Sequence, residues 1–242
     1  MAVGRLQVER LATDYGDAAA DEALARDLAG GEEAEPSAAF ARYLSGRTAF
    51  FDRVTVDALE RGVRQVVSVG AGYDGRAFRY ARAGVRWWEV DHPATQADKR
   101  ARLRRLAVDT AHVSFVAHDL RQPGLAAALD QAGFEPDAPA LITCEGVMIY
   151  LPPDAIGRLL EELRSVAACD TRLAFSAAVQ RPGDGRGGDR KRLWSALRSL
   201  GEPPVGLLTA GQFTDLLQRT GWRRVDGEER SEWPGLVLVA PT

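Results

Sequence analysis

Apolar residues along the chain follow two different periods. Between Thr48 and Arg61 they fall at positions 50, 51, 54, 58 and 59, which is the spacing of one helix face. From Val63 to Val69 the pattern changes to a β-branched run that ends in glycines, which predicts a buried strand. Further short apolar runs predict strands at Trp87–Val90, Val113–Ala117, Leu141–Cys144 and Arg172–Ala177.

The segments between these strands have the composition of helices. They cover 75–83, 95–108, 123–132 and 154–167. Alternation of buried apolar strands with helices predicts a mostly parallel sheet that is covered by helices on both faces.

The C-terminal part predicts a different ending for this sheet. Thr209 is placed to cap a helix that runs to about Thr220, with Gly221 at its end. Two strands follow at Trp222–Glu229 and Leu236–Ala240, and their short connection makes them an antiparallel pair.

Two other segments have a character of their own. Residues 1–45 read as helical and acidic, with a break at Gly30-Gly31, and predict a cap that packs on the core or a lid over a site. We therefore divide the chain into an N-terminal helical cap, 1–46, and a main domain, 47–242. The glycine-rich charged stretch 181–190 predicts a loop, with a short helix at Lys191–Leu200 after it.

Bulk composition excludes several classes of protein. The formal net charge of −3 offers no concentrated basic face for nucleic acid. No run of about 18 apolar residues predicts a membrane span, and no secretory h-region is found at the start, so we expect a cytoplasmic protein. The two cysteines, Cys144 and Cys169, lack zinc-site or disulfide-framework spacing, so no metal is expected.

The first strand leads into a glycine-rich loop, Gly70-Ala71-Gly72-Tyr73-Asp74-Gly75. Glycines allow the backbone to approach a ligand closely, and this spacing occurs at dinucleotide sites as well as at other nucleoside sites. Asp74 would repel a pyrophosphate, whereas S-adenosylmethionine has no phosphate and carries positive charges. About 60 residues precede the strand, which also disfavours NAD.

Carboxylates follow the next three strands. Asp91 lies 21 positions beyond Gly70, where an acidic residue can accept hydrogen bonds from both ribose hydroxyls. Asp119, beside Leu120, could accept from an adenine amino group, and Glu145 could hold an ammonium or a hydroxyl. Because ligands bind at the carboxyl ends of parallel strands, the set predicts one nucleoside cofactor site.

These residues together resemble the leucine carboxyl methyltransferase family. The resemblance is carried by Arg47-Thr48-Ala49-Phe50-Phe51-Asp52, the loop from Gly70 to Arg76, Glu89-Val90-Asp91, His118-Asp119-Leu120, and the segment from Glu145 to Leu151. It runs from about Arg47 to Ser176 and implies a class I, Rossmann-like methyltransferase fold with a seven-stranded sheet. It also implies S-adenosylmethionine as the cofactor.

The resemblance implies a role for each matching residue. Arg47 would pair with the cofactor carboxylate, and Glu145 would lie near the methionine moiety. Asp91 would hold the ribose, while Asp119 and Leu120 would contact adenine. The cofactor site we expect therefore comprises Arg47, Gly70, Ala71, Gly72, Asp91, His92, Asp119, Leu120 and Glu145.

The acceptor is less constrained by the sequence. The three histidines, His92, His112 and His118, all precede the middle of the chain, and this favours an acceptor that ionises without a strong base, a carboxylate or an acidic hydroxyl. The candidates for acceptor binding are Tyr150 and Arg121, followed by the basic residues Arg181, Arg186, Arg190, Lys191 and Arg192.

The predicted function is therefore transfer of a methyl group from S-adenosylmethionine to an oxygen of a small molecule, such as a polyketide-type metabolite. A protein C-terminal carboxylate is an alternative acceptor. An NAD-dependent oxidoreductase and a non-catalytic cofactor-binding protein stay open as alternatives of another class.

Overall fold

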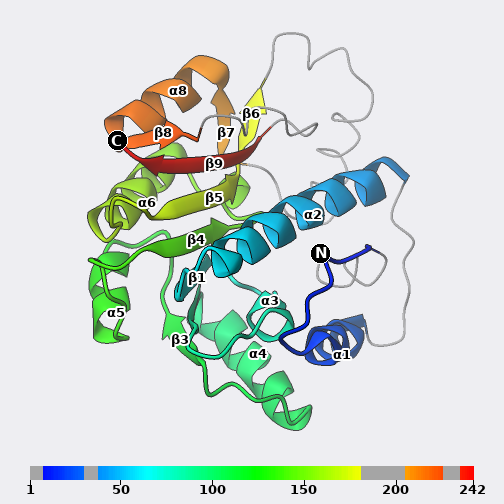
Figure 1. Ribbon diagram of the computed structural model, residues 1–242. Coiled ribbons are helices and arrows are strands. Elements are labelled where there is room, and N and C mark those ends of the chain that lie inside the picture. Colours follow the sequence, from blue (N-terminus) through cyan, green and yellow to red (C-terminus); the bar gives the residue numbers. More distant parts are fainter. Residues whose placement is uncertain (1–7, 30–37, 181–204, 226–234) are drawn as a thin grey trace.

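The computed structural model describes residues 8–29, 38–180, 205–225 and 235–242. Its main feature is a seven-stranded sheet with the order β3-β2-β1-β4-β5-β9-β8 (Figure 1). The strands are β1 (Gln65–Val69), β2 (Arg86–Asp91), β3 (Val113–Ala117), β4 (Ala140–Cys144), β5 (Arg172–Ser176), β8 (Trp222–Arg224) and β9 (Leu236–Pro241).

Strands β1 to β5 are parallel, and β9 runs antiparallel to both β5 and β8. This confirms the predicted mostly parallel sheet with an antiparallel ending, and each of the five predicted parallel strands lies within two residues of its expected bounds. The strand order reverses between β1 and β4. In open sheets of this kind, ligands bind beyond the carboxyl ends of the strands at that reversal.

Successive side chains of each strand point to opposite faces of the sheet, so the two faces have separate cores. Val66 of β1 and Trp87 of β2 belong to a cluster with residues of α1 (Ala18–Ala29), α3 (Arg76–Arg79) and α4 (Pro93–Arg105). Val67 and Trp88, one position further on, belong to a cluster on the other face.

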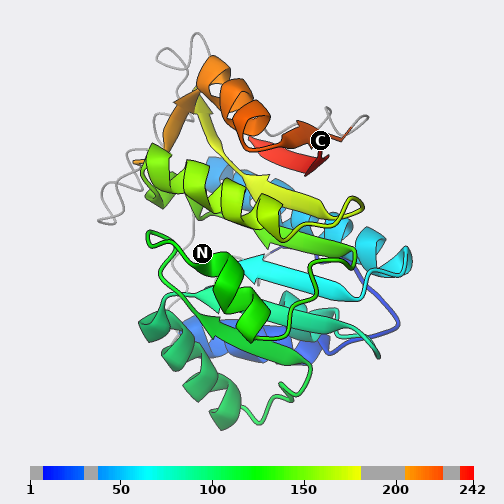
Figure 2. The same cartoon turned by 90° about the vertical axis from the view of Figure 1, so that its left-hand side faces the viewer.

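That second cluster includes residues of α5 (Leu125–Gln131), α6 (Pro153–Ser165) and α8 (Ala210–Arg219). Figure 2 shows α5 and α6 in front of the sheet, with the long helix α2 (Ala38–Glu60) behind it. Helices on both faces were expected from the strands, because strands buried on both faces are apolar throughout.

Helix α8 begins as its sequence predicts. The Thr209 hydroxyl accepts from the Gln212 amide, and the Gln212 side chain accepts from the Thr209 amide, which forms a reciprocal capping box. The helix ends before Gly221, whose positive φ of 72° suits glycine.

Two helices differ from the prediction. Helix α2 begins at Ala38 rather than near Thr48, so Arg47 lies inside the helix and not just before it. Helix α3 has only four residues instead of the predicted 75–83. The Phe78 carbonyl accepts hydrogen bonds from the amides of Asp17 and Ala81, which is not the i to i+4 pattern of an α-helix.

The proposed boundary between residues 46 and 47 falls inside helix α2, and the division into a cap and a main domain stays a prediction. Three short elements were not anticipated: the parallel strands β6 (Ala178–Gln180) and β7 (Leu207–Thr209), and the 3-10 turn η2 (Met148–Tyr150). The predicted loop at 181–190 and helix at Lys191–Leu200 lie outside the described residues. Within the described ranges, no helix is long and apolar enough to cross a membrane.

Candidate functional site

The loops that follow β1 and β4 meet at the point where the strand order reverses. Gly70 has a positive φ of 67°, and its amide donates to the Val90 carbonyl at 2.8 Å. A Cβ added to Gly70 would lie 2.2 Å from a methyl carbon of Val147, in the loop after β4. Both the conformation and the space therefore require glycine at position 70.

Asp91, at the end of β2, lies against this glycine loop. One of its carboxylate oxygens accepts from the Gly72 amide, and the other accepts from the His92 amide at 2.6 Å. These two bonds fix the orientation of the carboxylate. Each carboxylate oxygen can accept more than one hydrogen bond, so Asp91 retains the capacity to accept from a pair of neighbouring hydroxyls.

The glycine loop is also held from the protein interior. The buried Lys99 of α4 donates from Nζ to the Asp74 carbonyl at 2.6 Å and to Glu89 Oε2 at 2.7 Å. Burial raises the pKa of the Glu89 carboxyl, although Lys99 opposes this shift. The Lys99–Glu89 pair therefore connects the second strand to the backbone of the loop.

The Asp74 side chain does not have the role that its sequence position suggested. The side chain is 11% exposed and accepts from the Arg76 amide at 3.0 Å and from Arg76 Nη1 at 2.7 Å. Its charge is compensated inside the protein. This pairing weakens the repulsion of a pyrophosphate that the sequence predicted, so the loop alone discriminates less against a dinucleotide than expected.

Glu145, which follows β4, accepts hydrogen bonds from two arginines. Arg47 Nε donates to Oε1 at 2.9 Å, across 98 positions of sequence, and Arg76 Nη1 donates to Oε2 at 2.5 Å. The side chains of Arg47 and Glu145 are 5% and 6% exposed. Burial opposes the charge of Arg47, but Glu145 and Tyr43 keep the pKa of its guanidinium above the ordinary value.

Arg76 and Asp52 were not among the predicted site residues. Arg76 Nε donates to Asp52 Oδ1 at 2.7 Å, while Arg10 donates to the same carboxylate from Nε at 2.7 Å and from Nη2 at 3.0 Å. Burial opposes ionisation of Asp52, yet the two arginines hold the pKa of its carboxyl below the ordinary value. Asp52 and Arg76 both stand in the segments that carry the family resemblance, which is a signal that could have identified them.

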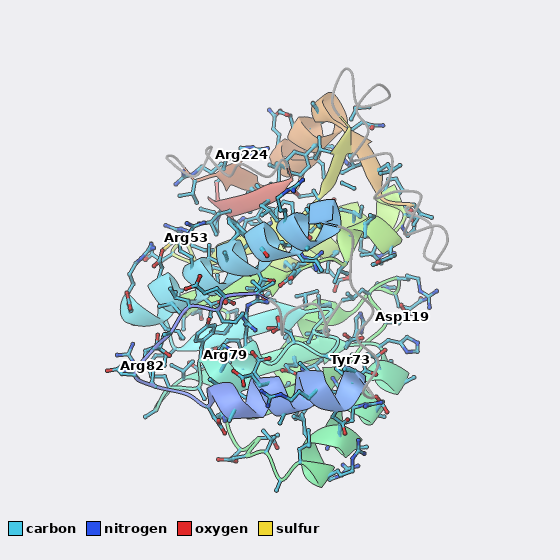
Figure 3. All side chains as sticks on the ribbon, turned by 90° about the vertical axis from the view of Figure 1, so that its right-hand side faces the viewer. Arg53, Tyr73, Arg79, Arg82, Asp119 and Arg224 are labelled. Atoms are coloured by element: carbon cyan, nitrogen blue, oxygen red, sulfur yellow. The ribbon has the colours of Figure 1, made fainter. Side chains whose placement is uncertain are left out.

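The loop after β3 carries a separate, more exposed group. Arg121 donates to both carboxylate oxygens of Asp119, with a shortest contact of 2.8 Å from Nη2. The side-chain hydrogen bonds from Arg121 lower the pKa of Asp119 to about 2. Figure 3 shows Asp119 on the same side of the molecule as Tyr73, a residue of the glycine loop. Leu120 is half-buried and packs against the core.

The two acceptor candidates lie at different strand ends. Tyr150 belongs to η2 after β4, whereas Arg121 follows β3. In the order β3-β2-β1-β4 these ends are three strand spacings apart, or about 14 Å. The Ile149 carbonyl accepts from the amides of Val205 and Gly206 at 2.9 Å, which holds the turn in place.

The histidines all contact nearby backbone atoms. His92 Nδ1 accepts from the Ala94 amide at the start of α4, His112 Nε2 lies 2.7 Å from the Ala77 carbonyl, and His118 Nε2 lies 3.2 Å from the Gln122 carbonyl. The basic residues 181, 186 and 190–192 lie outside the described residues. In the part of the chain that the structure describes, no cluster of metal-ligating side chains is found.

Two solved structures with this architecture are methyltransferases by name. A provisionally named methyltransferase from Thermobifida fusca YX superposes with a TM-score of 0.63 at 16% identity, over 92% of this chain and 88% of that one. Magnesium protoporphyrin IX methyltransferase from Synechocystis PCC 6803, with bound S-adenosylhomocysteine, gives 0.57 at 16% identity, over 90% and 93%. At these identities the likeness establishes the class I methyltransferase fold.

Sequence relatives point in the same direction. A protein of Mycolicibacterium gilvum, provisionally named an S-adenosyl-L-methionine-dependent methyltransferase, is 39% identical over 62% of this chain and 50% of its own length. A similarly named protein of Mycobacterium marinum is 42% identical over 56% of this chain and 44% of its own length. The chain thus spans about half the length of these relatives.

The comparison with family models covers more of the chain. The leucine carboxyl methyltransferase model matches residues 6–164, which is more than half of the sequence and includes all of the glycine loop, Arg47 and Glu145. The chain therefore belongs to the leucine carboxyl methyltransferase family.

Proposed function

We propose that this protein is an S-adenosylmethionine-dependent methyltransferase that transfers the methyl group to an oxygen of a small molecule, either a carboxylate or an acidic hydroxyl. The observation that carries the proposal is the buried Arg47–Glu145 pair beside the glycine loop. Family membership and the provisional names of the relatives support the same cofactor. They favour it over NAD, which the sequence of the loop left open.

The charges at the end of β4 fit the amino acid end of this cofactor. An α-amino acid carries an ammonium and a carboxylate on adjacent atoms. Arg47 and Glu145 present the two complementary charges within 2.9 Å of each other, with little exposure to water. A planar guanidinium can bind a carboxylate at two points, and a carboxylate oxygen can accept from an ammonium.

The nucleoside end fits the residues after β2 and β3. Asp91 is oriented by two backbone amides and can still accept from vicinal hydroxyls. Asp119 and Leu120 offer a carboxylate and an apolar surface for a base. The sulfonium of the cofactor, when bound, supplies an electrophilic methyl group. The residues of the chain bind and orient the two reactants, which supplies much of the rate in a direct displacement.

An acceptor that is already ionised at neutral pH suits the described residues best. The three histidines contact backbone atoms near β2, α3 and β3, and are not placed at the end of β4. A carboxylic acid with a pKa near 4 needs no base, whereas an ordinary phenol near 10 does. Tyr150 lies in η2, shortly after Glu145 in the sequence, and is the residue we propose for contact with the acceptor. Arg121 pairs with Asp119 and suits the adenine end better.

The first test is binding. Calorimetric titration with S-adenosylmethionine, S-adenosylhomocysteine and NAD should show binding of the first two only. Asp91→Ala should remain folded and lose affinity, because charged hydrogen bonds contribute about 1.5–3 kcal/mol each. Binding of NAD alone, or of none of the three by the wild-type protein, would reject the proposed cofactor.

The second test is turnover. The protein is incubated with isotope-labelled S-adenosylmethionine and a pool of small-molecule acids and phenols, and products heavier by one CH2 unit are sought by mass spectrometry. Mild base hydrolyses a methyl ester but leaves an aryl methyl ether intact, so the treatment separates the two acceptor classes. A peptide with a free C-terminal carboxylate tests the protein acceptor that the family description suggests. Cofactor binding without any labelled product would favour a non-catalytic protein.

A further inference from the structure

One arginine contacts three carboxylates that come from separate parts of the chain. The Arg76 side chain is 3% exposed. Its guanidinium lies 2.7 Å from Asp52 of α2, 2.7 Å from Asp74 of the glycine loop, and 2.5 Å from Glu145 after β4. Arg76 therefore joins helix α2, the glycine loop and Glu145 through ion pairs.

The chemistry of the guanidinium makes this junction rigid. Its donors lie in one plane at fixed angles, so the acceptors bound to it take fixed positions relative to one another. Glu145 uses Oε1 for Arg47 and Oε2 for Arg76. Without Arg76, the Glu145 carboxylate could turn both oxygens to Arg47 as a two-point pair, which is the preferred geometry of that contact. Asp74 and Glu145 would also lose a shared counterion.

We propose that Arg76 is a positioning residue for the amino acid end of the cofactor. By holding Oε2 of Glu145, it keeps Glu145 and Arg47 in the arrangement that an ammonium and a carboxylate need. This inference rests on the proposed function of the site. It assigns to Arg76 a role in ligand recognition through Glu145, beyond its contribution to the stability of the fold.

The N-terminal segment braces the same junction. Arg10 donates to Asp52 from two nitrogens and to Asp21 of α1 from a third, at 2.7 Å. Gly75 leaves room for this arrangement, since a Cβ there would lie 2.0 Å from an Asp21 oxygen. Residues 8–29 thereby stabilise the position of Asp52, and through it the position of Arg76.

Helix α3 supplies a matched control three residues further along. Arg79 is also buried, at 9% exposure, and donates to Asp21 at 2.6 Å and to Glu22 at 3.4 Å. Figure 3 shows it above α1. Arg79→Met therefore removes a buried arginine from the same short helix, while the contacts of Arg76 with its three carboxylates and those of Arg10 with Asp52 are retained.

The experiment compares two ligands across three variants, Arg76→Met, Arg76→Lys and Arg79→Met. S-adenosylhomocysteine carries the amino acid end, whereas 5′-methylthioadenosine has the same nucleoside and sulfur without it. Dissociation constants are measured by calorimetry, at a temperature where circular dichroism shows each variant to be folded. The quantity of interest is the ratio of the two constants, because a general loss of folded protein lowers both affinities equally.

For Arg76→Met we expect the affinity for S-adenosylhomocysteine to fall by about tenfold or more, the effect of one charged hydrogen bond. The affinity for 5′-methylthioadenosine should stay near that of the wild type. Arg76→Lys should show a smaller loss in the same direction, since an ammonium cannot reproduce the planar contacts. Arg79→Met should leave the ratio unchanged even if its melting temperature falls.

An unchanged ratio in folded Arg76→Met overturns the proposal, and so does an equal change of the ratio in Arg79→Met. If Arg76→Met does not fold, Arg76→Lys decides, and a wild-type ratio there overturns the proposal. These outcomes differ from failure of the proposed function. In that case the wild-type protein itself binds neither ligand.

Discussion

Replacement of Arg47 by alanine is the most direct test of how the site recognises its cofactor. The Arg47 side chain is 5% exposed, and its Nε lies 2.9 Å from Glu145 Oε1. A carboxylate bound to Arg47 would therefore be largely desolvated. Loss of one partner from a buried ion pair costs about 3–5 kcal/mol, or a factor of roughly 10² to 10³ or more in affinity.

The effect of the same substitution on stability should be smaller. Glu145 keeps Arg76 as a partner at 2.5 Å, so it is not left as an unpaired buried charge. We expect Arg47→Ala to lower the free energy of unfolding by about 1.5–3 kcal/mol, the range for one hydrogen bond to a charged group. Arg47→Lys should restore part of the affinity, because an ammonium lacks the two-point geometry.

The assay is a calorimetric titration of both variants with S-adenosylhomocysteine and 5′-methylthioadenosine, together with a urea unfolding curve. Binding of the first ligand should fall strongly, and binding of the second should be nearly unchanged. Equal losses for both ligands would mean that Arg47 acts through the fold. No loss for either would mean that the methionine end binds elsewhere.

Three further predictions concern the loops. Lys99→Met should lower the free energy of unfolding by about 3–5 kcal/mol in a urea titration, because it leaves the buried Glu89 unpaired. A double variant with Glu89→Gln should recover part of the lost stability, and additive losses for the two substitutions would contradict the pairing. Gly70→Ala should cost about 1–3 kcal/mol in thermal unfolding, because position 70 has a positive φ and its Cβ would meet a valine methyl; wild-type stability would contradict the geometry. Arg121→Ala should raise the pKa of Asp119 from about 2 toward its ordinary value, as followed by carbon NMR. Folding lowers the pKa of the Asp119 carboxyl, so its ionised form stabilises the folded state at a pH above the unfolded pKa near 3.9. In the wild type this stabilisation is lost as the pH falls toward 2. If the Asp119 pKa is the same in Arg121→Ala as in the wild type, the pairing is contradicted.

The hydrophobic pattern by itself determined most of the sheet. Strands β1 to β5 are short apolar runs because both of their faces are covered, and each lies within two residues of its predicted bounds. The location of the candidate site also followed from the pattern. Residues after successive parallel strands must meet at one edge, so Gly70, Asp91 and Glu145 could be grouped before their contacts were known.

The ends of short elements were decided by contacts between distant parts of the chain, and no periodic pattern in the sequence indicates such contacts. Helix α3 is four residues long, and the carbonyl near its end also accepts from Asp17, a residue some 60 positions earlier. The pair β6 and β7 joins segments on either side of residues 181–204, and each strand has only three residues. Such short strands leave too little alternation to be recognised.

The partners of the charged residues were decided by the tertiary structure alone. Asp74 was expected to repel a pyrophosphate, but its carboxylate pairs with Arg76 inside the protein. Arg47 pairs with Glu145, which lies 98 positions away in the sequence, and Arg10 pairs with Asp52, 42 positions away. A strand or a helix repeats its apolar residues at a fixed interval, because one face packs against a continuous surface. An ion pair requires only that two side chains converge in space, and that convergence depends on the path of the whole chain.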